Sequence, residues 1–241
     1  DTLIAGVKMS KEEIMRRLRG PKGTRVKLGV VRRGISERLF FEVVRDKIPV
    51  KTVDGYYMIR PRVGYIRIGS FGLTTYDEFM EAVKALKQQG MQDLILDLQE
   101  NGGGYLQAAV RVANEFLHKG DLIVYTQGRS VPKQEFRAQG NGRLLEGKVI
   151  VLVNEFSASA AEIVTGAIQD QDRGQVVGRR SFGKGLVQRP IEFKDGSMMR
   201  LTVAHYFTPS GRCIQKPYVK GEMKDYALEL DQRYKHGEFY S

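Results

Sequence analysis

The sequence lacks tryptophan and has one cysteine, Cys213, among its 241 residues. A single cysteine excludes a disulfide within the chain and a cysteine-based metal site. No apolar run approaches the roughly 20 residues that a membrane-spanning helix needs. The chain shows no secretory signal and does not begin with methionine, so we expect its natural N-terminus to lie further upstream.

Histidine is also scarce, which narrows the choice of a catalytic base. The chain has only His118, His205 and His236. None of them lies in a recognisable triad motif or in an H-E-x-x-H zinc motif, and no G-x-S-x-G segment is present. A serine hydrolase built on this sequence would therefore need a base other than histidine, and lysine is the alternative.

Positive charge is concentrated at one end of the chain. The formal net charge is +11, and residues 1–60 hold 15 Lys or Arg against 7 Asp or Glu. Such a stretch could bind nucleic acid or an anionic membrane surface, although a solvated basic face is commoner. No zinc-finger spacing or RNP-like aromatic motif accompanies it. A nucleic-acid or membrane-surface module is kept as an alternative function.

Hydrophobic periodicity predicts alternating strands and helices, which indicates an α/β core. Ser10 and Glu13 have the spacing of a capping box, so a helix is expected over 10–19. Residues 46–62 are interpreted as a connector, and residues 215–241 give no clear fold signal. Strands are expected at 25–31, 38–44, 63–69, 93–98, 148–153 and 175–178, helices at 74–89, 106–117 and 158–169, and hairpin segments at 186–193 and 197–207.

Two strand ends carry the residues that could do chemistry. The runs at 93–98 and 148–153 are nearly continuously apolar, as in buried parallel strands, and ligand sites lie at the carboxyl ends of such strands. The first is followed by the glycine turn 102–104, whose backbone N–H groups could bind phosphate or stabilise an oxyanion, or which could be a plain tight turn. The second is followed by the small residues 157–161 at a helix start, where Ser157 could be only an N-cap.

Lys184 is the candidate base for a serine nucleophile. A lysine must be neutral to accept a proton, so we expect Lys184 to be buried, which would lower its pKa. Ser181 and Lys184 also match the S-x-x-K pattern of penicillin-binding proteins. That pattern needs a helix, which Gly183 and Gly185 disfavour, and its companion motifs are absent.

Several segments, in this order, resemble motifs of the C-terminal processing peptidases, also called tail-specific proteases, which are serine proteases of bacteria and plastids. The resemblance runs over nearly the whole chain. Its segments are RGPKGTRVKL (19–28), GYIRIGSF (64–71), LILDLQENGGG (94–104), VNEFSASAAEIVTGAIQDQDRG (153–174), VVGRRSFGKGLVQ (176–188) and YFTPSGRCIQ (206–215).

The resemblance assigns roles to residues of these motifs. It implies that Ser159 is the nucleophile, that Lys184 is the general base, and that Gln188 holds the lysine in place. It also implies an oxyanion site made by backbone N–H groups of the residue after the nucleophile and of the glycine turn, namely Ala160 with Gly103 or Gly104. No metal and no organic cofactor are expected.

The resemblance also implies the fold class and the domains. We expect a crotonase-like α/β protease core at 48–214, the C-terminal part of a PDZ domain at 1–47, and an extension of uncertain structure at 215–241. The first half of the PDZ domain and the family's closing GG-x-x-PD-like segment are not found, so we expect the sequence to be cut at both ends.

The implied function is a serine endopeptidase that cleaves proteins near their C-termini in the periplasm or cell envelope. Its partners would be proteins or peptides with unstructured C-termini, bound as an added strand by the PDZ part. We expect no nucleic-acid partner, and we consider association with a membrane surface and with further copies of the chain. The alternatives are the basic module above and a non-catalytic peptide-binding protein on the same fold.

Overall fold

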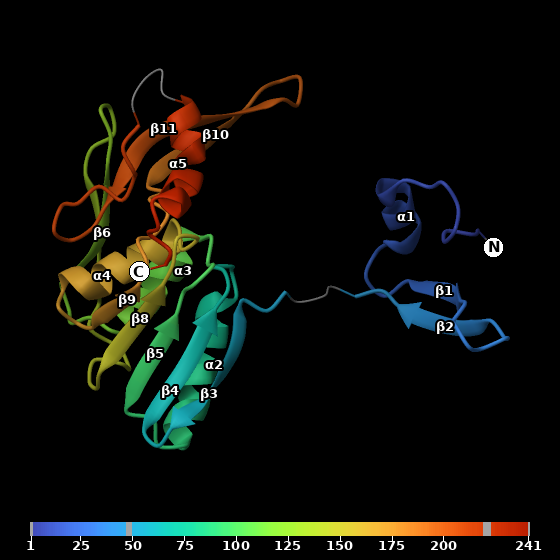
Figure 1. Ribbon diagram of the computed structural model, residues 1–241, viewed down its shortest axis with the longest axis horizontal. Helices are drawn as coiled ribbons and strands as arrows, with labels where there is room; N and C mark the ends of the chain where they lie inside the picture. Colours follow the sequence, from blue (N-terminus) through green and yellow to red (C-terminus); the bar gives the residue numbers. More distant parts are fainter. Residues whose placement is uncertain (1, 47–49, 219–222, 241) are drawn as a thin grey trace. The chain divides into compact units, whose positions relative to one another are not determined.

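The computed structural model describes residues 2–46, 50–218 and 223–240 (Figure 1). It contains two compact units, Asp1–Val50 and Lys51–Ser241. The boundary expected between residues 47 and 48 lies outside the described residues. Within the described ranges, no helix is long and apolar enough to span a bilayer.

The first unit has one helix and one antiparallel strand pair, as predicted. These are α1 (Lys11–Leu18), β1 (Arg25–Val30) and β2 (Leu39–Val44). The Ser10 hydroxyl accepts the Glu13 N–H at 3.2 Å, but the Glu13 carboxylate bonds to Arg17 at 2.8 Å. Only half of the predicted capping box therefore forms.

A five-stranded sheet, ordered β3-β4-β5-β8-β9, is the centre of the second unit. β3 runs antiparallel to β4, and the other three pairs are parallel. The prediction of a connector at 46–62 is wrong, because much of this segment forms β3. Asp54 and Gly55 are typical of a turn, but they lie within this edge strand, where the pairing register shifts. The strands are β3 (Val53–Arg60), β4 (Val63–Ile68), β5 (Asp93–Asp97), β8 (Val149–Val153) and β9 (Gln175–Gly178).

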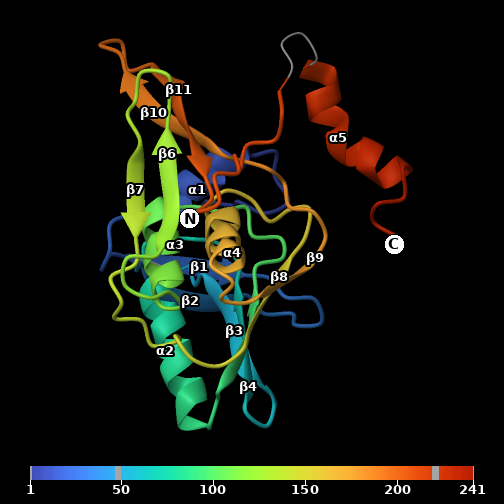
Figure 2. The same ribbon diagram turned by 90° about the vertical axis from the view of Figure 1, so that its left-hand side faces the viewer.

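Three helices lie along one side of this sheet (Figure 2). They are α2 (Thr75–Gln88), α3 (Leu106–Asn114) and α4 (Ala160–Asp170). The crossovers β4-α2-β5 and β8-α4-β9 advance across the sheet in the same direction, and right-handed crossovers of this kind place their helices on the same face.

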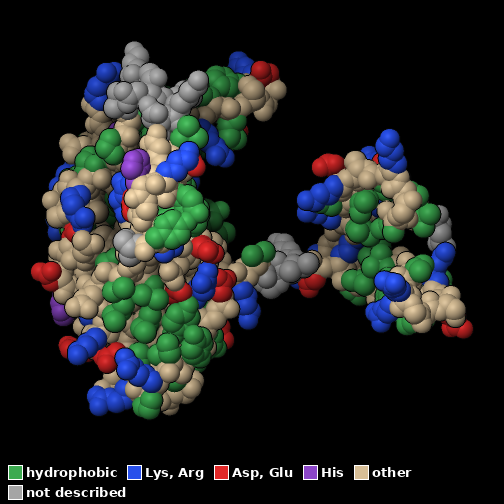
Figure 3. All heavy atoms as spheres, in the orientation of Figure 1, with side chains coloured by type: hydrophobic (Ala, Val, Ile, Leu, Met, Phe, Trp, Pro, Cys, Tyr) green, Lys and Arg blue, Asp and Glu red, His purple; other side chains and the backbone are tan. Residues whose placement is uncertain are grey.

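Burial of the parallel strands alternates, instead of being continuous as predicted. Ile66 and Leu96 face the helices and are fully buried, whereas Ile95 and Ile150 on the opposite face are half-buried. Apolar side chains gather on the face of the sheet that is turned away from the helices (Figure 3). The helices thus cover one face of the sheet, and the hydrophobic core lies between the helices and that face.

A second sheet, ordered β10-β11-β6-β7, is antiparallel. The hairpin of β10 and β11 was predicted, whereas β6 and β7 were not. The 215–241 extension, for which no structure was predicted, contains helix α5. The bounds are β6 (Leu122–Gln127), β7 (Gln134–Arg137), β10 (Leu186–Glu192), β11 (Met198–Phe207) and α5 (Met223–Lys235). The protein is therefore a mixed α/β fold.

Candidate active site

Ser159 has a strained backbone at the junction between β8 and α4. Its φ and ψ angles are 56° and −112°, although it is not a glycine. Such conformations cost of the order of 1–3 kcal/mol and cluster at functional sites. A serine on a sharp strand-to-helix turn projects its hydroxyl outward, and this is how several hydrolases present a nucleophile. The local geometry thus favours Ser159 over Ser157, which is fully buried and donates its hydroxyl to the Leu98 carbonyl at 2.7 Å.

Asn101 fixes the glycine turn against the segment that carries Ser159. It is fully buried, and its side-chain amide donates to the Ile68 carbonyl at 2.7 Å. Its side-chain oxygen accepts the Gly103 N–H at 2.9 Å, and its backbone carbonyl accepts the Ala158 N–H at 2.9 Å. Asn101 therefore links the two strand ends predicted to carry the chemistry.

Gly103 lies directly against Ser159. Its φ is 95°, and an added Cβ would lie 2.6 Å from the Ser159 Cβ and 2.7 Å from the Ala158 carbonyl oxygen. No side chain fits there. The structure thus brings the predicted glycine turn to the predicted nucleophile.

The predicted oxyanion donors differ in what their N–H groups already bind. Gly103 donates to Asn101. Among the residues that the structure describes, the N–H groups of Gly104 and Ala160 have no protein acceptor. Ala160 is the first residue of α4, where a free N–H and the helix dipole both favour a negative oxygen. Ala160 and Gly104 are therefore better suited than Gly103 to bind an oxyanion.

Glu162 joins the backbone of Ser159 to that of Lys184. One carboxylate oxygen accepts the Ser159 N–H at 2.8 Å and the Lys184 N–H at 2.9 Å. The other accepts the Gly183 N–H and the Ser181 hydroxyl, both at 2.7 Å. Glu162 was not identified from the sequence, although its position three residues after Ser159 is the capping-box spacing.

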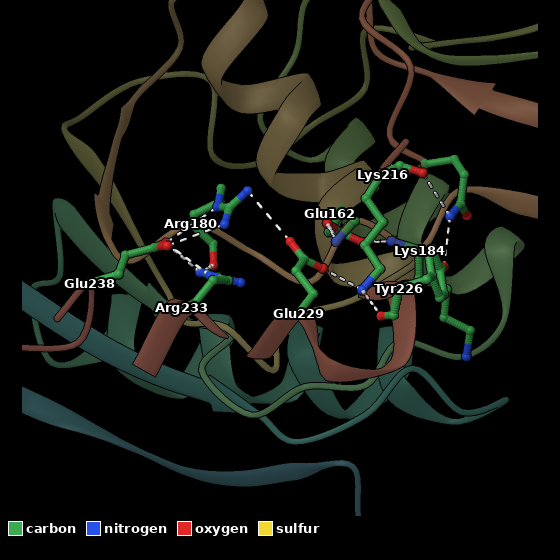
Figure 4. A network of polar contacts seen from close by, with 10 residues as sticks. Glu162, Arg180, Lys184, Lys216, Tyr226, Glu229, Arg233 and Glu238 are labelled. Carbon is green, nitrogen blue, oxygen red and sulfur yellow. Dashed lines mark hydrogen bonds and ion pairs between the residues drawn. The ribbon is translucent and has the colours of Figure 1, made fainter. Parts of the chain in front are cut away.

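The Lys184 side chain is exposed, so the burial predicted for it is wrong for this arrangement. In the described part of the chain its ammonium has no hydrogen-bond or ion-pair partner, and Figure 4 shows the side chain extending away from Glu162. Its backbone is nevertheless fixed, because the neighbouring Phe182 N–H donates to the Ser157 carbonyl at 3.0 Å.

Gln188 lies on β10 beside a register shift and is exposed. In the described structure no hydrogen bond joins its amide to Lys184. Of the predicted site residues, the structure brings together Ser159, Ala160 and Gly103, and it holds the backbone of Lys184 beside them. Within the described ranges, no group of three His, Cys, Asp or Glu could hold a metal ion.

Comparisons with known proteins agree on one family. The family model "Peptidase family S41" matches residues 62–224. The chain is 37% identical to the carboxy-terminal processing protease CtpA of Bacillus subtilis, over 95% of this chain and 50% of that protein. It is 38% identical to the carboxyl-terminal-processing protease of Synechocystis, over 92% of this chain and 51% of that protein. The chain thus spans about half the length of the curated relatives it matches.

A solved structure shares the fold. The photosystem II D1 C-terminal processing protease aligns with a TM-score of 0.63 and 31% sequence identity, covering 81% of this chain and 54% of that protein. The mixed α/β architecture described above is therefore one that a processing protease has.

Proposed function

This chain belongs to peptidase family S41, and we propose on that basis that it is the catalytic part of a C-terminal processing serine endopeptidase. The observation that carries the proposal is the strained Ser159, held against Gly103 at the start of a helix. Backbone strain of this kind persists only where the surrounding structure enforces it. Here Glu162 and Asn101 enforce it, next to the N–H groups of Ala160 and Gly104, which have no acceptor among the described residues.

In the proposed reaction, the Ser159 hydroxyl attacks a peptide carbonyl and loses its proton to the neutral amine of Lys184. The N–H groups of Ala160 and Gly104 stabilise the tetrahedral oxyanion. Lys184 then protonates the leaving amine, and water hydrolyses the acyl-enzyme. Gln188 orients Lys184 when the lysine side chain turns towards Ser159.

A rotation of the Lys184 side chain would complete this arrangement without a backbone movement. The backbone nitrogens of Ser159 and Lys184 bond to the same Glu162 oxygen, so they lie no further apart than the sum of those bonds, 2.8 Å and 2.9 Å. The four-carbon stem of lysine is flexible and long enough to cover this distance. Exposed side chains change rotamer within nanoseconds, so the Lys184 side chain can readily leave its exposed position.

The wider assignment follows from the same resemblance. We propose that Lys51–Ser241 contains a crotonase-like protease core and that Asp1–Val50 is the C-terminal part of a PDZ domain. The substrates would be proteins with unstructured C-terminal tails, bound by strand addition. The site of action would be the periplasm or cell envelope.

The test is cleavage of a folded reporter protein that carries a disordered C-terminal tail. We expect the wild type to release the tail, and Ser159→Ala and Lys184→Ala each to lower kcat/KM by at least about 10³-fold, the range seen for catalytic serines and their bases. Thermal unfolding should change little, because Ser159 is a helix N-cap, whose replacement by Ala typically costs about 1 kcal/mol, and the Lys184 side chain is exposed. Near-normal cleavage by either variant would refute the assignment, and tail binding without cleavage by the wild type would favour a non-catalytic peptide-binding protein.

A further inference from the structure

The loop that carries Lys184 contacts the 215–241 extension, for which no structure was predicted. We call residues 180–185 the base loop. The N–H of Lys216 donates to the Gly183 carbonyl at 2.9 Å, and the N–H of Gly185 donates to the Gln215 side chain at 3.0 Å. The backbone on both sides of Lys184 is therefore fixed by two consecutive residues.

Gly183 and Gly185 allow this close approach. A Cβ on Gly183 would lie 2.8 Å from the Lys216 Cβ, and one on Gly185 would lie 2.4 Å from the Gln215 backbone nitrogen. Movement of residues 215 and 216 towards the base loop would therefore displace its backbone, because the two segments are in close contact.

The side chain of Lys216 connects the base loop to α5. It is only 11% exposed, and its ammonium pairs with Glu229. The same ammonium lies 4.8 Å from the ring centroid of Phe182 in the base loop and 4.2 Å from that of Tyr226 in α5. A charge so nearly buried requires a counter-charge, because removing one partner leaves the other unpaired and poorly solvated.

Glu229 also pairs with the first residue of the base loop. Its carboxylate lies 3.5 Å from the Arg180 guanidinium, and Arg233, one turn further along α5, donates to the Arg180 carbonyl at 2.7 Å (Figure 4). Arg233 is 4% exposed. Glu229 thus pairs with two cations, Arg180 in the base loop and Lys216 beside it.

We propose that Glu229 is a positioning residue for Lys184, acting through Lys216 and Arg180 on the backbone of the base loop. The inference rests on the proposed function for its catalytic consequence, but the coupling between α5 and the loop stands apart from it. Glu229 does not touch substrate. Its carboxylate keeps Lys216 in place, and Lys216 fixes Gly183 next to the catalytic lysine.

Kinetics of Glu229→Gln, measured with the tailed reporter, test the catalytic part. We expect kcat to fall about 10- to 100-fold with KM changed less than about twofold, because a misplacement of about 1 Å can cost 10² in rate. The pH–rate profile should differ from that of the wild type, which a purely structural role of Glu229 would not cause. Glu229→Asp should recover part of kcat.

The matched control is Asp231→Asn on the same helix. Asp231 pairs with Lys235 at 2.6 Å across exposed side chains, and in the part of the chain that the structure describes it has no hydrogen bond or ion pair with the base loop. We expect its kcat, KM and pH profile to match those of the wild type. If Glu229→Gln does not fold, Lys216→Met breaks the same ion pair from the other side and should give the same kinetic changes. Should the folded variant, whichever it is, retain the wild-type kcat and pH profile, the proposal is overturned.

Amide hydrogen exchange tests the coupling without reference to activity. In a Ser159→Ala background, Glu229→Gln should accelerate exchange at Gly183, Lys184 and Gly185, whereas Asp231→Asn should not. Unchanged exchange in both variants contradicts the coupling. If the wild type cleaves no substrate but exchange still responds to Glu229→Gln, the proposed function fails while the coupling is upheld.

Discussion

At the scale of single residues, buried polar side chains determine the distances within the site. Asn101 sets the spacing between the glycine turn and Ser159, and Glu162 sets that between Ser159 and the base loop. Both are almost fully buried, and among the described residues no buried side-chain nitrogen or oxygen lacks a hydrogen-bond partner. Satisfied buried networks of this kind rigidify a structure and favour a single arrangement.

Gly103 and Gly102 give a matched pair of substitutions. Gly103→Ala should abolish cleavage and destabilise the fold by at least about 1 kcal/mol, because φ is 95° and the new Cβ would overlap Ser159. Gly102→Ala should be nearly neutral, since an added Cβ meets no atom within 4 Å. Cleavage rates and melting temperatures of both variants check this. Equal effects in the two variants would mean that the contact with Ser159 is unimportant.

At the scale of helices and strands, sequence periodicity predicted the elements with a strong apolar pattern. The α2 helix has a clear amphipathic stripe, and β5 and β8 are short apolar runs, so each was located within a residue or two. β3 was missed because the Asp-Gly pair at 54–55 is typical of turns. α5 was missed because its sequence is polar and mixed, and its position depends on ion pairs with residues distant in sequence.

The site was predictable to the extent that it lies at strand ends. Carboxyl ends of parallel strands meet at one edge, so the proximity of Ser159 to the glycine turn follows from the sequence. The contacts of Glu162 with the base loop do not, because they join residues about 20 positions apart that no local pattern brings together. The same holds for Glu229.

The attachment of α5 should weaken in acid. Hydrogen bonds from Arg233 and Arg180 lower the pKa of Glu238 from 4.5 to about 2. Because the pKa is depressed in the folded state, these contacts add stability above the unfolded pKa and lose it as the pH falls from about 4.5 towards 2. Limited digestion by an acid protease over that window should cut α5 progressively faster. In Glu238→Gln, cleavage of α5 should be faster at the top of the window and should change less with pH, and an identical response in both proteins would contradict this.

At the scale of the whole molecule, the candidate site and most of the excess positive charge lie in different units. Lys51–Ser241 contains every residue of the candidate site, and the excess positive charge is concentrated in residues 1–60, largely within Asp1–Val50. Part of that charge is paired on the surface, as between Arg25 and Glu42 and between Lys22 and Asp46. Exposed pairs of this kind contribute little stability. Their exposure to solvent agrees with a solvated basic face.

The central claim is that the amine of Lys184 can reach the hydroxyl of Ser159. A crystal structure of the Ser159→Ala protein with a C-terminal tail peptide bound across the site tests it most directly. We predict that the Lys184 amine turns inward to within hydrogen-bonding distance of the position that the hydroxyl occupies, with the peptide carbonyl oxygen facing the N–H groups of Ala160 and Gly104. A bound peptide with the Lys184 amine still pointing into solvent would contradict the account.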